Sequence, residues 1–418
     1  MLYFGEIGAQ QLAAKRFLSV SAGNGSGPGE QGCVADRGSV PVGDHIRAWI
    51  VLRILAVANA VLAALRFCLW PRRPRTIERI GVYRIGNIGD IVCALPALSA
   101  IRRAYPRARL TLVTSSGNPS LPGAKDILAN AGWIDELMTY EPARGAGWLG
   151  LLKQIRQRRF DLWIVLPPGS ASLRRQLRDT IAARMAGVRW GCGWRLDAVR
   201  VWRRAQSRLL AFPNEVDRLM TIVRGAGMQA DEYTFPLPLD GVAARVKSLL
   251  REHPEILERP LVAIAPGAKR EPNRWPAERF AEVAAALCAR GSAVVTLGGP
   301  GDATLCAQVA SAAGVTGLNL AGRTSILESC EVLKRCRLLI CNDSGVQHLA
   351  AAVGTPCVSI FSFRDFKGRW FPHGSRNVVL QKWVPCAVCL LESCPRDNLC
   401  LRLITSSEVI ENASAQLG

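Results

Sequence analysis

The residues LLICNDSGVQHLAAAVGTP, 338–356, place a buried strand directly before a helix of small residues. The first four are apolar and typical of a strand that is covered on both faces, and Asn342–Gly345 interrupt them with a polar turn. A helix is predicted over 347–353. A strand that passes through a tight turn into a helix is the repeating unit of parallel sheets that carry helices on both faces.

The same unit recurs on both sides of this stretch. Strands are predicted at 80–85, 110–114, 137–140 and 162–166, and again at 261–265, 293–297, 338–341 and 357–361, with helices between them. Residues 235–258 contain three prolines and a charged helix, which is typical of an inter-domain connection. We therefore expect an α/β protein of two Rossmann-like, doubly wound domains, 76–240 and 241–418, which face each other across a cleft.

The N-terminus does not follow this pattern. Residues 1–44 are rich in Gly and Ser and are predicted to be a disordered leader. Residues 45–75 form an apolar segment with interspersed arginines, and its longest uncharged stretch, 54–65, is shorter than a membrane span requires. Three interpretations stay open: a helix in a membrane interface, a helix packed on the protein, and a true span. The arginines favour peripheral attachment to an anionic leaflet.

The charge predicts an anionic partner. The 418 residues include 53 Lys and Arg against 33 Asp and Glu, a net charge of +20, and residues 76–240 hold 24 of the bases against 14 of the acids. A composition that is 49% hydrophobic excludes a disordered or collagen-like chain. Most of the 14 cysteines stand alone in apolar runs, as buried thiols do in a reducing compartment.

The turn after the first strand, Arg84–Asp90, reads RIGNIGD. It lacks both the dinucleotide fingerprint and the P-loop lysine, so an NAD-dependent dehydrogenase is the least favoured class. Gly86 and Gly89 permit a tight turn, which places Asp90 in the first turn of the next helix. Asp90 has two interpretations, a helix cap or a general base that takes a proton from an acceptor hydroxyl.

The turn at 342–345 is predicted to bind a diphosphate. A helix N-terminus offers free N–H groups and the positive end of the helix dipole. Asp343, Ser344 and Gly345 form this turn, and His348, one helical turn later, adds a hydrogen-bond donor or a positive charge.

These motifs together resemble a known family. Arg84–Asp90 with Leu95–Leu98 looks like the N-terminal signature of the lipopolysaccharide heptosyltransferases, glycosyltransferase family 9. Asn342–Pro356 is similar to the C-terminal signature of that family, and Pro266–Lys269 with Arg274–Pro276 is similar to a loop between them. The resemblance extends from about Ile80 to about Val409.

The resemblance implies a GT-B fold and an inverting, metal-independent transfer from ADP-heptose, with no cofactor. The N-terminal domain would bind a lipid-linked, anionic glycan acceptor of the lipopolysaccharide-core type, and the C-terminal domain the nucleotide sugar. Asp90 matches the proposed general base of the family, and Asp343, Ser344, Gly345 and His348 match its diphosphate-contacting motif. The implied location is the cytoplasmic face of the inner membrane.

Two donor contacts stay open. Family members carry a lysine two residues before Trp-Pro, where this chain has Asn273, so Lys269 or Arg274 is expected to contact the phosphates, with Arg270 less favoured and solvated loop charges as the alternative. Asp302 matches an acidic residue near the donor ribose, and it is equally well placed to cap the following helix, 303–313.

Two further clusters have no assigned catalytic role. Cys386, Cys389, Cys394 and Cys400 have a spacing compatible with zinc, although free thiols or a disulfide are favoured. Basic groups in the first domain fit a phosphorylated glycolipid and membrane headgroups, a solvated surface or, least well, nucleic acid. They comprise Arg156, Arg158, Arg159, Arg174, Arg175, Arg178, Arg200, Arg203 and Arg204, with Trp190, Trp194 and Trp202 between the later ones.

Two other functions remain as alternatives. One is a glycosyltransferase of the same fold that uses another nucleotide sugar, for capsule or another surface glycan. The other is a non-catalytic binding protein that retains the fold.

Overall fold

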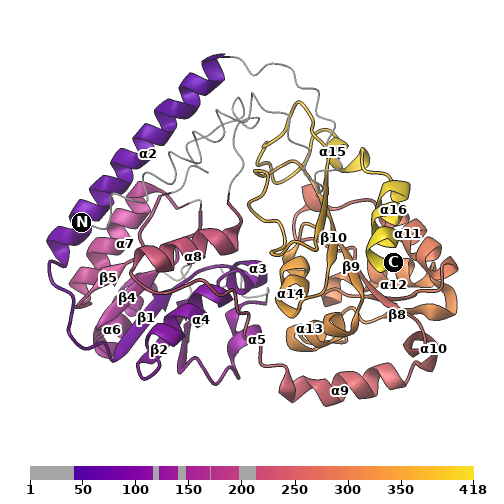
Figure 1. The fold of residues 1–418 in the computed structure, drawn as a ribbon, viewed down its shortest axis with the longest axis horizontal. Coiled ribbons are helices and arrows are strands. Elements are labelled where there is room, and N and C mark those ends of the chain that lie inside the picture. The colour runs from indigo at the N-terminus through magenta and orange to yellow at the C-terminus, as the bar shows by residue number, and fades with distance from the viewer. Residues whose placement is uncertain (1–41, 116–121, 140–146, 170, 197–212) are drawn as a thin grey trace. The chain divides into compact units, whose positions relative to one another are not determined.

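The computed structural model describes residues 42–115, 122–139, 147–169, 171–196 and 213–418 (Figure 1). The predicted leader, apart from residues 42–44, lies outside them, as do Arg200, Trp202, Arg203 and Arg204 of the basic groups. The first element is α2 (Val42–Leu69), a single helix over most of the apolar segment. No helix in the described part of the chain combines the length and apolar character needed to cross a membrane.

The first sheet has five parallel strands in the order β3-β2-β1-β4-β5. They are β1 (Arg79–Tyr83), β2 (Arg109–Thr114), β3 (Glu136–Thr139), β4 (Leu162–Val165) and β5 (Gly191–Cys192). The helices around it are α3 (Ile88–Val92), α4 (Leu95–Ala104), α5 (Ala124–Leu128), α6 (Gly147–Arg158), α7 (Leu173–Met185) and α8 (Glu215–Gly225). The chain runs outward from β1 in both directions, so β1 and β4 flank the topological switch point.

The second sheet has six parallel strands in the order β11-β10-β9-β6-β7-β8. They are β6 (Leu261–Ala265), β7 (Ala293–Thr296), β8 (Gly317–Asn319), β9 (Leu338–Asn342), β10 (Cys357–Phe361) and β11 (Val378–Gln381). Helices α9 (Asp240–Arg251) and α10 (Pro254–Leu257) connect the sheets. The remaining helices are α11 (Ala277–Ala289), α12 (Ala303–Ser311), α13 (Ile326–Arg335), α14 (Gly345–Val353), α15 (Leu399–Arg402) and α16 (Ser406–Leu417).

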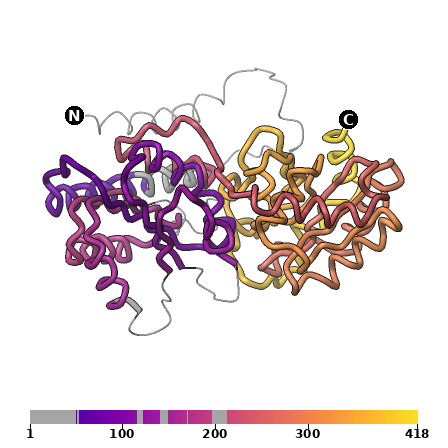
Figure 2. Tube along the Cα trace, turned by 90° about the horizontal axis from the view of Figure 1, so that it is seen from below, coloured from indigo at the N-terminus to yellow at the C-terminus, as the bar shows by residue number. Residues whose placement is uncertain are grey.

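Both sheets are buried on both faces, which explains their uninterrupted apolar strands. In β4, Leu162 and Ile164 belong to one hydrophobic cluster, whereas Trp163 and Val165 belong to another on the opposite face. The fold is therefore α/β with two Rossmann-like sheets, as the alternating pattern predicts. Figure 2 follows the chain from indigo to yellow through both sheets. The domain boundaries at 240 and 241 stay predictions.

The structure differs from the sequence-based prediction in two details. The helical segment that we expected between the strands at 80–85 and 110–114 is split into α3 and α4, because Pro96, near the start of α4, has no N–H to continue a helical ladder. The short strands β5, β8 and β11 were not predicted. Two to four residues give too little periodicity to be recognised as a strand.

Candidate functional site

The turn between β1 and α3 holds Asp90 in place through its own backbone. The Asp90 Oδ2 accepts a hydrogen bond from the Asn87 N–H at 3.1 Å. Gly86 has φ +155°, and a side chain there would overlap that of Asp90. The helix-cap interpretation of Asp90 is therefore confirmed, and a glycine is required at position 86 because only a residue without a side chain leaves room for this carboxylate.

The second Asp90 oxygen faces a buried arginine. Arg84 is fully buried, and its Nη2 lies 3.3 Å from Asp90 Oδ1 and 3.0 Å from Glu215 Oε1. Its Nη1 donates to the carbonyl oxygens of Leu166 and Pro167, just beyond β4. Arg84 thus occupies the switch point between β1 and β4, where open α/β sheets bind their ligands.

Glu215 forms ion pairs with two buried arginines, Arg84 and Arg218. Arg218 donates to both of its carboxylate oxygens at 2.7 Å, in the bidentate geometry of strong ion pairs. Burial opposes ionisation, but Arg218 and Arg84 together hold the pKa of Glu215 at about 2. Glu215 is therefore a permanent negative charge beside Arg84.

Asp90 has the opposite shift. Burial raises its pKa above the ordinary value, Arg84 lowers it in part, and the charge on Glu215 raises it further. About 23% of the Asp90 side chain stays exposed, so the carboxylate is accessible. A carboxylate with an elevated pKa at an accessible position has the properties of a general base.

The turn after β9 is built around Asn342. Its side-chain amide donates to the Pro266 carbonyl at 2.6 Å, and its Oδ1 accepts from the Trp275 N–H at 3.0 Å. Asn342 thereby ties the ends of β6 and β9 together at the switch point of the second sheet. Ser344 is the N-cap residue of α14, but its side chain does not cap the helix, so it leaves the first N–H groups of α14 uncapped.

Asp343 lies next to neutral partners. Asn273 Nδ2 donates to its Oδ2 at 3.0 Å, and Gln347 Nε2 donates to its Oδ1 at 3.2 Å. Burial, with repulsion from Asp365, raises the pKa of Asp343 to about 7. Asn273 stands where members of the family that the sequence resembles carry a lysine, so in this chain the group at that position is neutral.

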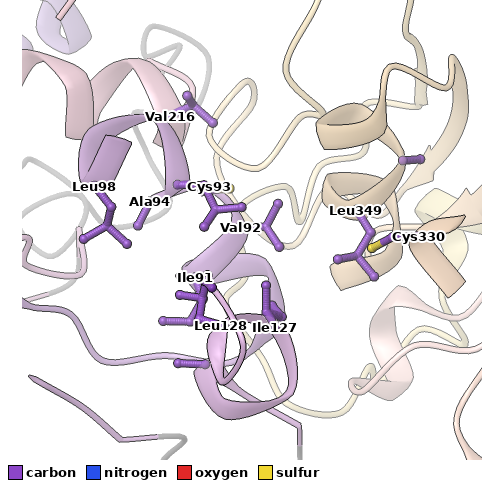
Figure 3. Close-up of a cluster of buried hydrophobic side chains, with 14 of the residues drawn as sticks. Ile91, Val92, Cys93, Ala94, Leu98, Ile127, Leu128, Val216, Cys330 and Leu349 are labelled. Atoms are coloured by element: carbon purple, nitrogen blue, oxygen red, sulfur yellow. The ribbon is translucent and has the colours of Figure 1, made fainter. Parts of the chain in front are cut away.

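The two signature turns meet. A Cβ on Gly89 of α3 would lie 3.0 Å from the His348 ring of α14, and His348 Nδ1 lies 3.5 Å from Cys93 Sγ. Figure 3 shows Val92 of α3 and the next residue, Cys93, in the same apolar cluster as Leu349 of α14. Asp90 and the N-terminus of α14 therefore belong to one site.

His348 is a neutral group in this packing. Its ring is buried, and burial lowers its pKa to about 4. The sequence suggested that His348 supplies either a hydrogen-bond donor or a positive charge. Because the ring is neutral at neutral pH, it can supply the donor but not the charge.

The exposed cations of the loop after β6 differ in their existing contacts. Arg270 pairs with Glu392 at 3.1 Å, and Arg274 Nε donates to the Ala268 carbonyl at 2.9 Å. Lys269 is exposed and has no hydrogen bond or ion pair with any residue that the structure describes. Of the three cations in this loop, Lys269 therefore has the fewest hydrogen bonds and ion pairs with the described residues.

Asp302 lies where a donor ribose contact was expected, at the ends of β6 and β7. A Cβ on Gly267 would come within 2.5 Å of its Oδ1. Its Oδ2 accepts from the Gly299 N–H at 3.0 Å, which caps the short 3₁₀ turn Pro300–Asp302. It does not cap α12 with its side chain, as the alternative interpretation proposed.

The cysteine cluster forms no metal centre in the part of the chain that is described. No three His, Cys, Asp or Glu side chains there are arranged as metal ligands. Cys386, Cys389, Cys394 and Cys400 are all free thiols, so neither the zinc nor the disulfide alternative has the required arrangement. Cys400 Sγ instead accepts from the Phe363 N–H at 3.4 Å.

Comparisons with known proteins identify the family of this chain. Residues 148–399, more than half of the chain, match the model of glycosyltransferase family 9 (heptosyltransferase). The chain belongs to this family. It is a glycosyltransferase, and the matched residues include the turn at Asp343 but not the turn at Asp90.

Relatives of this glycosyltransferase are similar over most of their length. The lipopolysaccharide heptosyltransferase 2 of Escherichia coli is 24% identical over 66% of this chain and 80% of its own. A family 9 glycosyl transferase structure from Veillonella parvula has a TM-score of 0.64 at 20% identity, covering 81% of this chain and 97% of its own. The E. coli ADP-heptose LPS heptosyltransferase II has a TM-score of 0.57 at 21% identity, covering 81% and 98%. These structures establish the GT-B fold.

Several charged residues of the site were not assigned a role from the sequence. Arg84 was noticed only as part of a motif, and Glu215, Arg218, Arg364 and Arg369 not at all. Arg364 and Arg369 are buried in the loop after β10, and Arg369 lowers the pKa of Asp90. The spacing of Glu215 and Arg218 on α8 indicates an ion pair, but no sequence pattern links them to Arg84, which is 131 residues away.

Proposed function

We propose that this glycosyltransferase moves a heptose from ADP-heptose, with inversion and without a metal ion, to a lipopolysaccharide-core or related glycan acceptor. One observation carries the proposal: the carboxylate of Asp90, with its raised pKa, lies beside the N-terminus of α14. The names of the relatives support the donor and acceptor classes, because they are described as lipopolysaccharide and ADP-heptose heptosyltransferases.

The proposed reaction is a single displacement. Asp90 takes the proton from an acceptor hydroxyl, whose oxygen forms a bond to the anomeric carbon of the donor. The bond between that carbon and the diphosphate oxygen breaks, and ADP leaves with the bonding electrons. The proton ends on Asp90, and attack opposite to the leaving group inverts the anomeric centre.

The negative charge that develops on ADP requires fixed positive groups. We assign this role to the N–H groups at Ser344 and Gly345, to Lys269, and to the buried Arg369 near Asp90. His348 supplies a hydrogen bond from a neutral ring. Since His348 packs against Gly89, we propose that α3 and α14 separate to admit the donor.

We further propose that the enzyme works while attached peripherally to the cytoplasmic face of the inner membrane, where a lipid-linked acceptor is presented. The basic residues of the first domain are assigned to an anionic glycolipid and to membrane headgroups, and no nucleic-acid partner is proposed.

The decisive experiment is calorimetric titration of the full chain with ADP, UDP, GDP and their sugar conjugates, without added metal. We expect selective binding of ADP and ADP-heptose, followed by release of ADP when an acceptor is supplied. Absence of any nucleotide binding would instead favour a non-catalytic protein that retains the fold.

One observation favours a second candidate, a glycosyltransferase with another nucleotide sugar. Asn273 presents an amide to Asp343 where family members carry a lysine, so the polar groups around the donor differ in charge. Preferential binding of a UDP- or GDP-sugar in the same titration would support this candidate and retain the fold and the proposed base.

A further inference from the structure

The outer face of α2 is apolar and exposed. Ile50, Ile54, Val57 and Val61 follow one another at spacings of four, three and four residues, which places them on one side of a helix. Their exposed fractions range from 45% to 65%. Such a row of exposed aliphatic side chains is unusual on a protein surface that faces only water.

The opposite face of α2 fixes its orientation on the protein. Leu55 and Leu62 are buried against Leu196, with Leu173 and Leu177 of α7 beside them. Asn59 donates to the Leu196 carbonyl at 3.1 Å and accepts from the Leu196 N–H at 2.8 Å. Packing on the protein, one of the three interpretations of this segment, is therefore confirmed, and it leaves the outer face unpartnered among the described residues.

The neighbouring helix also exposes apolar side chains. Figure 1 shows α7 beside α2, and Ile181 and Met185 of α7 are 45% and 71% exposed. Phe67, near the end of α2, is also exposed. The two helices together carry seven of the fourteen exposed large hydrophobic side chains in the described part of the chain. We call Ile50, Ile54, Val57, Val61, Phe67, Ile181 and Met185 the α2–α7 face.

The same two helices, and the segment just after α2, carry exposed arginines. Between Asp44 and Glu78 the sequence contains six arginines and no acidic residue. Among them, Arg53, Arg72, Arg73 and Arg75 are exposed, and α7 adds the exposed Arg174, Arg178 and Arg184. Apolar side chains together with arginines match the boundary between lipid headgroups and acyl chains, where cations meet phosphates.

We propose that the α2–α7 face docks flat on a lipid bilayer that contains anionic phospholipid. This deepens the peripheral attachment included in the proposed function, because it specifies the surface and the orientation of α2. The charge decides against a second copy of the chain as the occupant. Two such faces would bring like-charged arginines together, whereas anionic headgroups neutralise them.

The test is co-sedimentation of the full chain with phosphatidylcholine vesicles, with and without phosphatidylglycerol. We expect binding that requires phosphatidylglycerol and weakens at high salt. The triple variant Ile54→Ser, Val57→Ser, Val61→Ser should bind the vesicles at least about tenfold more weakly than the native protein, because it removes apolar area that the bilayer would cover. Since the three side chains are exposed, the variant should keep the thermal stability of the native protein.

The matched control is Val315→Ser with Leu257→Ser, two exposed aliphatic residues remote in sequence from α2 and α7, at 85% and 49%. It should bind vesicles as the native protein does. Equal binding of the triple variant and the native protein, or no binding by the native protein, would overturn the proposal. So would light scattering that shows lipid-free dimers which the triple variant abolishes. ADP titration of the same variants separates this outcome from failure of the proposed function, since donor binding does not involve the α2–α7 face.

Discussion

Arg84 is shared between two carboxylates: its Nη2 lies 3.0 Å from Glu215 and 3.3 Å from Asp90. Glu215 also accepts two hydrogen bonds from Arg218, so it remains ionised, and its negative charge offsets part of the positive charge of Arg84. Asp90 therefore sits beside a cation that is already partly neutralised. Burial is the largest cause of the raised pKa of Asp90; Arg84 lowers that pKa in part, and the charge of Glu215 raises it further.

Replacement of the proposed base tests the mechanism. Asp90→Asn should lower turnover by about 10²- to 10⁴-fold, because the amide cannot accept the proton, while ADP binding is retained. The measurement is ADP release under saturating donor. Asp126→Asn is the matched control, since Asp126 accepts from the Gly123 N–H at the start of α5 just as Asp90 does from Asn87. Unchanged turnover in Asp90→Asn would remove Asp90 as the base.

The shared arginine predicts opposite shifts of the pH–rate profile. Glu215→Gln should lower the pKa of Asp90 and move the acidic limb to lower pH, because Arg84 then acts on Asp90 alone. Arg84→Gln should raise that pKa and move the limb to higher pH. Each variant leaves a buried charge without its partner and should cost about 3 kcal/mol in unfolding free energy, so thermal melts accompany the kinetics.

Glu328→Gln is the control for these two variants. Glu328 is also buried and paired with an arginine, at 2.9 Å from Arg245, but it caps α13 rather than contacting Asp90. It should change stability without moving the limb. Limbs that shift in the same direction for Glu215→Gln and Arg84→Gln would contradict the proposed sharing.

The raised pKa of Asp343 predicts a loss of stability as the pH rises from acidic to neutral. Its pKa is about 7 in the folded protein against 3.8 for the ordinary group, so the folded state holds the proton more tightly. The stabilisation is fully present below about pH 4 and disappears as the pH rises through 7. Asp343→Asn should remove this dependence, which we expect to be about 2 kcal/mol given the partly exposed side chain.

Position 273 offers an independent check of the same carboxylate. Asn273→Lys should give Asp343 an ion-pair partner, lower its pKa and flatten the decline in melting temperature between pH 5 and 8, a range set by the raised pKa of Asp343. Asn273→Ala removes the amide without adding charge and should keep the decline. If the lysine and alanine variants behave alike, the charge of Asp343 is not the cause.

His348 predicts the opposite trend in acid. Its pKa of about 4 lies below the ordinary 6.5, so stability is present above pH 6.5 and is lost as the pH falls towards 4, when the unfolded chain takes up the proton first. The loss should reach about 2 kcal/mol at pH 5, and His348→Gln should abolish it. His253→Gln, at a half-buried histidine paired with Glu255, should leave the loss in place. Persistence of the full loss in His348→Gln would show that another group is responsible.

The sheets and the two signature turns were predictable because they depend on local order along the chain. At Arg84–Asp90 and at Leu338–Val353 the sequence alone predicts an apolar strand, a glycine-containing turn and a helix, without knowledge of any contact. The strand runs at 80, 110, 162, 261, 293, 338 and 357 all appear in the structure. The catalytic and diphosphate roles were expected from the family resemblance, and they remain proposals.

The electrostatic state of the site was not predictable, because it depends on burial and on distant partners. Nothing adjacent to Asp90 in sequence indicates that Glu215 and Arg218 moderate its arginine, nor that the side-chain amides of Asn273 and Gln347 donate to the Asp343 carboxylate. His348 has the same side chain whether it is charged or neutral, and burial against α3 selects the neutral form.

The N-terminal helix shows the same division. Its composition indicates an apolar, arginine-containing helix, and composition is a property of the sequence alone. Which residues of that helix point outward depends on the packing of Leu55 and Leu62 against α7 and Leu196. The sequence by itself therefore determines local hydrogen bonding and apolar periodicity, because both depend only on the order of neighbouring residues. The charge state of buried groups and the exposed surface are decided only when segments far apart in the chain come into contact.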